Sequence, residues 1–159
     1  MKVSKKERNG EKNHRREEEA MLGKQKHTID AKNRIFLPSK FRAELGSDLV
    51  ISKSITGECI RVYSQENWDK FEEKIRSLPE IESDEEVWWI LTNAENIHVD
   101  DQGRIAIPQD YREYAHLDKD IISAGRGERM EIWDAKIFEE KQAAVDVSKL
   151  REALRKKGF

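Results

Sequence analysis

The stretch IDAKNRIFLPSKFR, residues 29–42, decides the fold, because it recurs as VDDQGRIAIPQDYR at residues 99–112. Sliding the chain over itself by 70 residues aligns the two stretches without a gap. Nine of the 29 positions from Asp30 to Glu58 are then identical, where chance would give about two. The chain therefore contains an internal duplication. Its identical pairs are Asp30/Asp100, Arg34/Arg104, Ile35/Ile105, Pro38/Pro108, Arg42/Arg112, Asp48/Asp118, Ile51/Ile121, Gly57/Gly127 and Glu58/Glu128.

Each copy predicts the same order of elements. A short strand leads into a tight turn, whose last residue, Asn33 or Gly103, is of a type that tolerates positive φ. An alternating strand then runs up to Pro38 or Pro108, which opens a short helix because the first helical turn does not need the missing N–H. A hairpin and a final helix follow. The hairpin strands are expected at 49–53, 59–63, 121–124 and 130–133.

These patterns predict an α+β chain, mainly β. Neither unit is large enough to bury a core alone, so the two should complete one another in one pseudo-twofold barrel with flanking helices. The first 20 residues carry seven bases and five acids, which is typical of a disordered arm. The expected segments are this arm at 1–20, the first repeat at 21–80, a helical linker at 81–93, the second repeat at 94–145 and a charged tail at 146–159.

The composition argues against several classes of protein. The longest apolar runs, such as residues 87–91, are far shorter than the roughly 20 residues that cross a bilayer. The charged N-terminus lacks the apolar segment of a secretion signal, so we expect a cytoplasmic protein. Cys59 has no second cysteine to pair with and is expected in the core. The four histidines show no ligand spacing, so we expect neither a metal nor a cofactor.

Charge is unevenly distributed, although the net charge is only −2. Residues 66–86 hold nine acids and three bases, whereas residues 24–42 hold one acid, Asp30, and six bases. Clustered lysines attract phosphate in a salt-dependent way. This local basic surface favours a nucleic-acid partner, with a merely solvated charged face as the alternative. Its bases are Lys24, Lys26, Lys32, Arg34, Lys40 and Arg42.

Both copies place an aspartate four residues before an arginine, across the turn: Asp30 before Arg34 and Asp100 before Arg104. Such a carboxylate can hold the guanidinium in a fixed orientation. An oriented guanidinium suits a phosphate or the O6 and N7 edge of guanine. The same pairs could instead be turn salt bridges that stabilise the fold, and the two roles are compatible.

Residues 21 to about 140 resemble the MraZ family of the AbrB-type swapped-hairpin superfamily. The resemblance rests on HTIDAKNRIFLPSKFRAELG from His27, on VDDQGRIAIPQDYREYAHLDKDI from Val99, on EIW at 131–133 and on the 70-residue spacing. It implies two tandem AbrB-like swapped-hairpin units. The family consists of bacterial DNA-binding regulators that associate with the nucleoid, assemble into rings and bind short G-rich direct repeats upstream of their own division and cell-wall operon.

By this resemblance the chain is a sequence-specific transcriptional regulator whose partners are double-stranded DNA and further copies of itself. We expect a nucleoid-associated ring oligomer, and neither a membrane partner nor a small-molecule substrate. The candidate DNA-binding residues are those of the two turns and two nearby lysines: Lys24, Lys26, Asp30, Lys32, Asn33, Arg34, Asp100, Gln102, Gly103 and Arg104.

This chain departs from the family pattern in several places. Asn33 stands where the family usually carries glycine, although asparagine also tolerates positive φ. Residues 83–89 read SDEEVWW where the family tends to be basic and phenylalanine-rich, which bears on ring geometry or on a further phosphate contact. The second copy is acidic around its turn, so we expect weak binding by one chain and multivalent binding by a ring. Met21 stands where members often begin, so residues 1–20 are either outside the native protein or an arm that adds DNA affinity.

Two other classes of function compete with a regulator. An enzyme could use Asp30 and Asp100 as an acid–base dyad, but the arginine beside each would keep it ionised, so we expect no catalysis. A ring-forming scaffold or protein-binding adaptor with weak or no specific DNA binding is the stronger alternative. An acidic helix at 66–86 ending in Trp88 and Trp89 could be its partner surface, or the tryptophans could be core or subunit-interface anchors. A DNA binder should lose affinity steeply with salt, and an adaptor should not.

Overall fold

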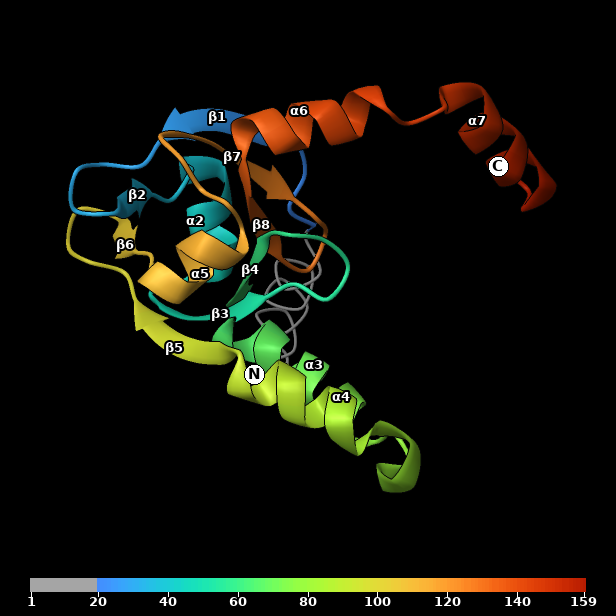
Figure 1. The fold of residues 1–159 in the computed structure, drawn as a ribbon, viewed down its shortest axis with the longest axis horizontal. Coiled ribbons are helices and arrows are strands. Elements are labelled where there is room, and N and C mark those ends of the chain that lie inside the picture. Colours follow the sequence, from blue (N-terminus) through green and yellow to red (C-terminus); the bar gives the residue numbers. More distant parts are fainter. Residues whose placement is uncertain (1–19) are drawn as a thin grey trace, which may run out of the picture.

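The computed structural model describes residues 20–159, with the backbone alone for residues 80–83. Within this range, eight strands form a six-stranded antiparallel sheet in the order β1-β7-β8-β4-β3-β5 and a separate two-stranded ribbon, β2-β6 (Figure 1). The predicted disorder at 1–20 concerns residues that, apart from Ala20, lie outside the described range. The strands are β1 (Lys24–Thr28), β2 (Arg34–Phe36), β3 (Asp48–Lys53), β4 (Ile60–Ser64), β5 (Ala94–His98), β6 (Arg104–Ala106), β7 (Asp120–Gly125) and β8 (Met130–Asp134).

Helices surround this sheet and mark the ends of the two copies. Pro38 and Pro108 directly precede the first helix of each copy, as predicted. Ser64 and Asp134 cap the last helix of each repeat, because their side chains accept the backbone N–H groups of Asn67 and Ile137. The helices are α2 (Ser39–Leu45), α3 (Gln65–Arg76), α4 (Glu80–Thr92), α5 (Gln109–Tyr114), α6 (Ala135–Ala143) and α7 (Val147–Lys156).

Each copy contributes one strand to the sheet beside the other copy. β1 of the first copy pairs along its whole length with β7 of the second, and β5 pairs in the same way with β3. In the ribbon, Ile35 lies opposite Ile105, its counterpart in the duplication. A pseudo-twofold axis therefore passes through this pair. The two units form one mixed α/β fold, and each completes the other, as the sequence predicted.

The predicted closed barrel is not confirmed. Within the described residues the sheet is open, with β1 at one end of the strand order and β5 at the other. The ribbon does not close it, because β2 and β6 are three residues long and pair with each other. The fold is therefore an open antiparallel sheet joined to a separate ribbon.

A single apolar core lies between the copies. Ile35, Phe41, Ile105 and Tyr111 are all at most 2% exposed and belong to one cluster that draws on both repeats. Two smaller clusters lie beside it, one around Tyr63 and Trp68 and the other around Trp133 and Phe138, where the last helix of each repeat packs on its hairpin. Burial of this shared apolar surface is the dominant favourable contribution to folding, and it requires both copies.

The gap-free alignment of the copies is wrong at one place. β3 and β7 correspond at a spacing of 72 residues, because Asp48 and Asp120 each begin a six-residue strand with the same order of exposed and buried residues. The pairs Asp48/Asp118 and Ile51/Ile121 are therefore not structurally equivalent. The second copy has two extra residues between α5 and β7. The loop between β7 and β8 is shorter by two residues than the loop between β3 and β4, so the spacing between the copies returns to 70 at Ile60 and Met130.

The acidic stretch at 66–86 spans two helices, so the partner surface considered from the sequence is not one continuous helix. α3 ends at Arg76, and α4 begins only after Pro79, which cannot donate a backbone hydrogen bond to continue the first helix. The expected linker helix is α4, and the charged tail contains α7. Across residues 20–159, no helix has both the length and the apolar character that a membrane span requires.

Candidate nucleic-acid interface

The turn between β1 and β2 is built around one carboxylate. Asp30 Oδ1 accepts the backbone N–H groups of Lys32 and Arg34, both at 2.9 Å. Asp30 Oδ2 accepts Nε of Arg34, also at 2.9 Å. Asn33 closes the turn with φ 60°, and its N–H donates to the carbonyl of Asp30 at 2.9 Å. The aspartate thus fixes the turn and the arginine side chain together.

The turn between β5 and β6 repeats this geometry. Asp100 Oδ1 accepts the backbone N–H groups of Gln102 and Arg104 at 2.9 Å, and Oδ2 accepts Nε of Arg104 at 2.9 Å. Gly103 has φ 82° and donates its N–H to the carbonyl of Asp100. In this turn and in the first, a carboxylate engages Nε of its arginine and leaves the terminal guanidinium nitrogens for another acceptor.

Both aspartates are held in their ionised form. The backbone N–H of Arg34 and, secondarily, its guanidinium hold the pKa of Asp30 below the ordinary value of 3.8, and Arg104 acts in the same way on Asp100. The acid–base dyad considered from the sequence would require one carboxyl to stay protonated near neutral pH. Each carboxylate is instead bonded within its own turn.

The ribbon places the two turns beside one another. β2 and β6 run antiparallel, the N–H of Leu37 donates to Gly103, and the N–H of Ile107 donates to Asn33. Figure 1 shows both turns on the same side of the molecule, away from α3, α4 and α7. The antiparallel pair therefore presents two oriented arginines on one surface.

Two further arginines lie at the turns, and the sequence reasoning left them out of the site. The guanidinium of Arg42 lies against Gly103, where an added Cβ would be 2.6 Å from Cζ of that arginine. Arg112 donates Nε to the carbonyl of Ile107 at 3.0 Å and lines the same shallow groove as Asp30. Each turn is thus flanked by an arginine of the other copy. The identity of Arg42 and Arg112 in the duplication could have identified both as candidate site residues.

Phe36 is a second residue that the sequence reasoning missed. Its side chain is 57% exposed at the end of β2, although a phenylalanine normally lies in the core. The guanidinium of Arg104, which lies opposite in the ribbon, is 5.7 Å from the ring centroid. The second copy has Ala106 at the equivalent position. The ribbon therefore presents an aromatic ring on one half only.

The structure does not bring all four predicted lysines to the turn. Lys32 is exposed at the turn itself. Lys24 donates to Gln142 at 2.7 Å and lies 5.6 Å over the ring of Phe138, so it contacts α6. Lys26 forms an ion pair with Glu139 at 3.1 Å, and this bond raises its pKa. Lys40 donates to the backbone carbonyl of Lys24 at 3.3 Å. α6 packs over β7, the neighbour of β1, and its side chains take up the first two lysines.

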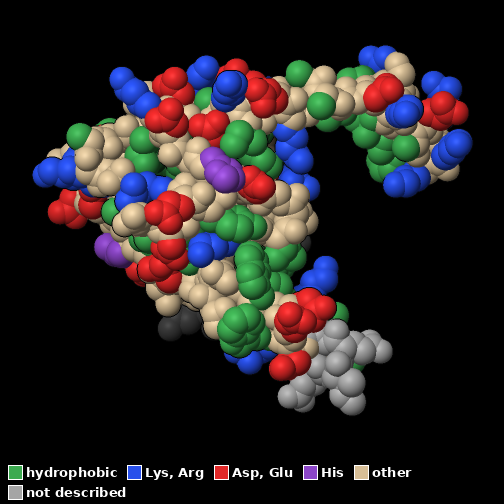
Figure 2. Space-filling view, viewed as in Figure 1, with side chains coloured by type: hydrophobic (Ala, Val, Ile, Leu, Met, Phe, Trp, Pro, Cys, Tyr) green, Lys and Arg blue, Asp and Glu red, His purple; other side chains and the backbone are tan. Residues whose placement is uncertain are grey.

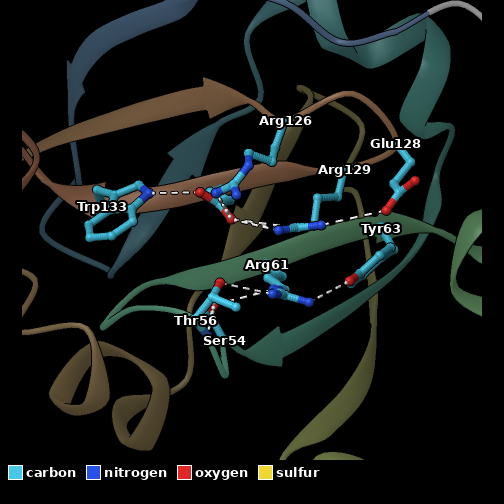
Figure 3. Close-up of polar contacts among 9 residues, drawn as sticks. Ser54, Thr56, Arg61, Tyr63, Arg126, Glu128, Arg129 and Trp133 are labelled. Atoms are coloured by element: carbon cyan, nitrogen blue, oxygen red, sulfur yellow. Dashed lines mark hydrogen bonds and ion pairs between the residues drawn. The ribbon is translucent and has the colours of Figure 1, made fainter. Parts of the chain in front are cut away.

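A separate polar cluster lies on the hairpins of the large sheet (Figure 3). Arg61 and Glu131, related by the duplication, lie opposite one another in β4 and β8. Arg61 donates to the side chains of Ser54, Thr56 and Tyr63, while Glu131 accepts from Arg126, Arg129 and Trp133. Among the described residues, no fully buried side-chain nitrogen or oxygen lacks a partner. The buried charges of this cluster are therefore paired among residues of the two hairpins.

Two other sequence-level candidates can be placed. Cys59 is fully buried, as expected, and burial raises the pKa of its thiol to about 12, so the thiolate is scarce at neutral pH. Among the side chains that the structure describes, no three of histidine, cysteine, aspartate or glutamate gather as a metal site would require.

Fold and site together define a class of protein: a tandem duplication in which two α/β units exchange sheet strands and present a pair of equivalent Asp–Arg turns. The particular family follows from comparison with known proteins. A family model described as "MraZ protein, putative antitoxin-like" matches residues 20–88 and 90–156. These two matched segments correspond to the two copies.

Individual relatives agree with the family model. The "Transcriptional regulator MraZ" of Caldanaerobacter subterraneus subsp. tengcongensis is 41% identical over 130 residues, covering 80% of this chain and 90% of that protein. The protein of the same name from Clostridium tetani is 37% identical over 141 residues, covering 87% and 99%. The chain belongs to the MraZ family, and the names of these relatives support a DNA-binding regulator.

Proposed function

We propose that this protein is a sequence-specific transcriptional regulator that binds duplex DNA through the turns at Asp30 and Asp100. The observation that carries the proposal is the pair of turns, in which an aspartate orients the guanidinium of Arg34 or Arg104 through Nε. The terminal nitrogens of such a guanidinium match O6 and N7 of guanine in the major groove. A two-stranded ribbon is one of the elements that this groove accommodates.

The residues around the turns receive different roles in this proposal. Arg34 and Arg104 contact base edges, and Asp30 and Asp100 orient them. Lys32, Asn33, Gln102 and Gly103 form the tips of the turns, where side chains and backbone N–H groups can reach phosphates. Lys24 and Lys26 would add only long-range attraction, since both contact α6.

The family resemblance supplies the biological setting of the proposal. We propose that the protein acts in the cytoplasm at the nucleoid, on short direct repeats upstream of its own division and cell-wall operon. A ring of several chains would present several first-copy turns to these repeats, which raises affinity by avidity even when one chain binds weakly. The exchange of β1 and β5 between the copies supports the swapped-hairpin relationship that the resemblance implies.

Fluorescence anisotropy tests the proposal. DNA from the protein's own upstream region is compared with a scrambled duplex while salt is varied. Arg34→Ala and Arg104→Ala should each weaken specific binding by about 1–3 kcal/mol. Arg76→Ala is the matched control, because Arg76 is an exposed arginine on α3, paired with Glu72 and not part of either turn. Unchanged binding in both turn variants would refute the paired-turn mechanism.

A protein-binding adaptor is the second candidate function, and one observation favours it. Trp88 is 62% exposed on α4, next to the exposed acids Glu85 and Glu86. An exposed tryptophan with a charged rim is typical of a protein interface. Absence of DNA binding at low salt by the folded, assembled protein would support this alternative, because a DNA binder should show its highest affinity there.

A further inference from the structure

Helix α7 presents an apolar surface that the rest of the chain does not cover. None of its residues is buried, and Val147, Leu150 and Leu154 are 49%, 48% and 39% exposed. Their spacing places them along one side of the helix, where Figure 2 shows the hydrophobic side chains gathered. Figure 1 shows α7 projecting away from the sheet. Its other sides carry four bases and one acid: Lys149, Arg151, Arg155, Lys156 and Glu152.

The first copy shows what such a helix does when it is packed. α4 follows α3 as α7 follows α6, so the two helices hold equivalent places in the duplication. α4 packs Ile90 and Leu91 against the cluster of Tyr63 and Trp68, and Trp89 lies 6.1 Å from the ring of Tyr114. α7 has no buried residue and makes no comparable packing within its own chain. Its apolar side is therefore suited to another surface.

A groove between α3 and α4 has the matching properties. Its volume is about 390 Å³, and its apolar floor includes Tyr63, Phe71, Ile75 and Ile90. Ile55 and Leu78 also line it and are 53% and 50% exposed, so the apolar lining of the groove is accessible to a second surface.

The charge of this groove comes from its two helices and from Glu128, which lies between β7 and β8 and is paired with Arg129. On the α4 side, Glu86 lines the groove, and Asp84 and Glu85 are exposed beside it on a helix that has no basic residue. On the α3 side, Lys70 and Lys74 line it, and Lys70 is paired with Glu66. The α4 side is thus the acidic face toward which a basic helix would orient.

A second groove, beside α6, fits α7 less well. It is lined by three bases, Lys24, Arg126 and Lys141, and by one acid, Glu131. Glu131 is buried and already bonded to Arg129 at 3.2 Å. A helix with four bases and one acid would meet like charge there. Charge therefore selects the groove between α3 and α4.

We propose that α7 of one copy of this chain docks its apolar side into the groove between α3 and α4 of a second copy. The helix and the groove are different surfaces, so the contact is head-to-tail and leaves one helix and one groove free on each pair. Repetition of the contact closes a ring or continues as a filament. This contact would be the subunit interface of the oligomer in the proposed function, and its biological meaning rests on that function.

The size of the contact predicts how the assembly behaves. α7 has ten residues and is therefore about 15 Å long, and it offers three apolar anchors. One such contact is well below the roughly 800 Å² per partner of a standard interface. An isolated pair should therefore dissociate readily, whereas closure of a ring adds a further contact without adding a subunit. Assembly should depend steeply on concentration.

Sedimentation velocity of the full chain, without DNA, tests the contact with two double variants. Leu150→Glu with Leu154→Glu alters the helix, and Ile55→Glu with Leu78→Glu alters the groove, all at exposed positions that leave the core intact. Each double variant should sediment as the 18.7 kDa monomer at concentrations where the unaltered chain is assembled. Lys136→Glu makes the same change in net charge at an exposed residue of α6 that lines neither groove, and Trp88→Glu alters an exposed residue that does not line the groove between α3 and α4. Both controls should keep most of the assembly.

Mixing the two double variants gives the decisive result. One retains an intact groove and the other an intact helix, so an equimolar mixture should form heterodimers at high concentration that grow no further and dissociate on dilution. Circular dichroism of each variant confirms that it is folded. If the helix variant sediments with the same mass as the unaltered assembled chain, the inference is overturned. It is also overturned if the unaltered chain is monomeric and its α7 resists proteolysis, because α7 would then pack within its own chain. DNA binding at low salt is measured in parallel, so that loss of assembly and failure of the DNA-binding proposal are distinguished.

Discussion

The turn at Asp30 and the turn at Asp100 share every hydrogen bond of their frame, yet they present different surfaces. In both turns the carboxylate accepts two backbone N–H groups and Nε of the arginine, each at 2.9 Å. Around the first stands Lys32, whereas Asp101 and Gln102 occupy the second. The helices differ in the same way, since α4 is packed and α7 is exposed. The residues that form the frame of each turn have stayed alike, while the exposed residues around the turns have diverged.

The largest expected effect concerns buried core residues that are identical in the two copies. Ile35→Ala and Ile105→Ala should each lower the free energy of unfolding by about 2–5 kcal/mol, because both side chains are buried in the shared core. Urea denaturation should show a single transition for both variants. The exposed neighbour Phe36 is the control, and Phe36→Ala should change stability by less than about 0.5 kcal/mol. Two separate transitions would mean that the copies fold independently.

The next effect tests how far the turns have diverged. Arg34→Ala should weaken DNA binding about tenfold or more, and Arg104→Ala should weaken it less. The reason is local charge: Lys32 attracts phosphate beside the first arginine, whereas Asp101 repels it beside the second. Anisotropy titrations at one fixed salt concentration measure both losses. Equal losses would show that the neighbouring charges do not set the contribution of each turn.

Exchange of the residues at the tips of the two turns should change DNA affinity in the same direction as the arginine variants predict, but by a smaller factor. Asp101→Ala with Gln102→Lys gives the second turn the residues of the first, and we expect binding to tighten severalfold at low salt. The slope of log affinity against log salt should steepen by about 0.9 for each added phosphate contact. The reverse exchange, Ala31→Asp with Lys32→Gln, should weaken binding and flatten the slope. An unchanged slope in both exchanges would exclude a phosphate contact at this position.

The smallest effect concerns a residue present in one copy only. His27 is part-buried in β1, bonded to Ser123 at 2.7 Å, and burial lowers its pKa below 6.5. The second copy has Ile97 at this position. Because the folded chain resists protonation of His27, its contribution to stability is complete above pH 6.5 and declines as the pH falls below that value.

His27→Ile should therefore flatten the decline of the unfolding free energy as the pH falls below about 6.5, measured by urea denaturation at several pH values. His98→Gln is the control, since that ring is exposed and hydrogen-bonded to Asp48 at the surface. A decline that persists in the His27 variant would show that another group causes it.

The duplication made much of this structure predictable. Turn, ribbon strand, short helix, hairpin and capped helix follow from local signals such as Asp30, Pro38 and Ser64, each of which acts on its near neighbours in the chain. Positive φ at Asn33 and Gly103 was predictable for the same reason. The orientation of the two arginines by their aspartates was also correctly inferred, because the four-residue separation keeps the pair within one turn.

What the sequence could not provide depends on contacts between distant residues. The contacts of Lys24 and Lys26 with Gln142 and Glu139 could not be predicted, because α6 lies more than 110 residues later in the chain. The two-residue shift between β3 and β7 was hidden because Asp48/Asp118 and Ile51/Ile121 match by identity alone. Phe36 was not singled out from the sequence, because its contact with the guanidinium of Arg104 depends on the pairing of β2 with β6.

The pairing of β1 with β7 also has a consequence for biosynthesis. Lys24 leaves the ribosome about 100 residues before its partner Ala124. Throughout that interval β1 has hydrogen-bonding groups that no strand can satisfy, and the first copy has made only part of its sheet. Folding of the first half must therefore wait for synthesis of the second, and the emerging chain is exposed to wrong pairing until then. A truncated product that ends before β7 would leave β1 permanently unpaired, so it should be cleared by the cell's proteases and not accumulate as a half-sized regulator.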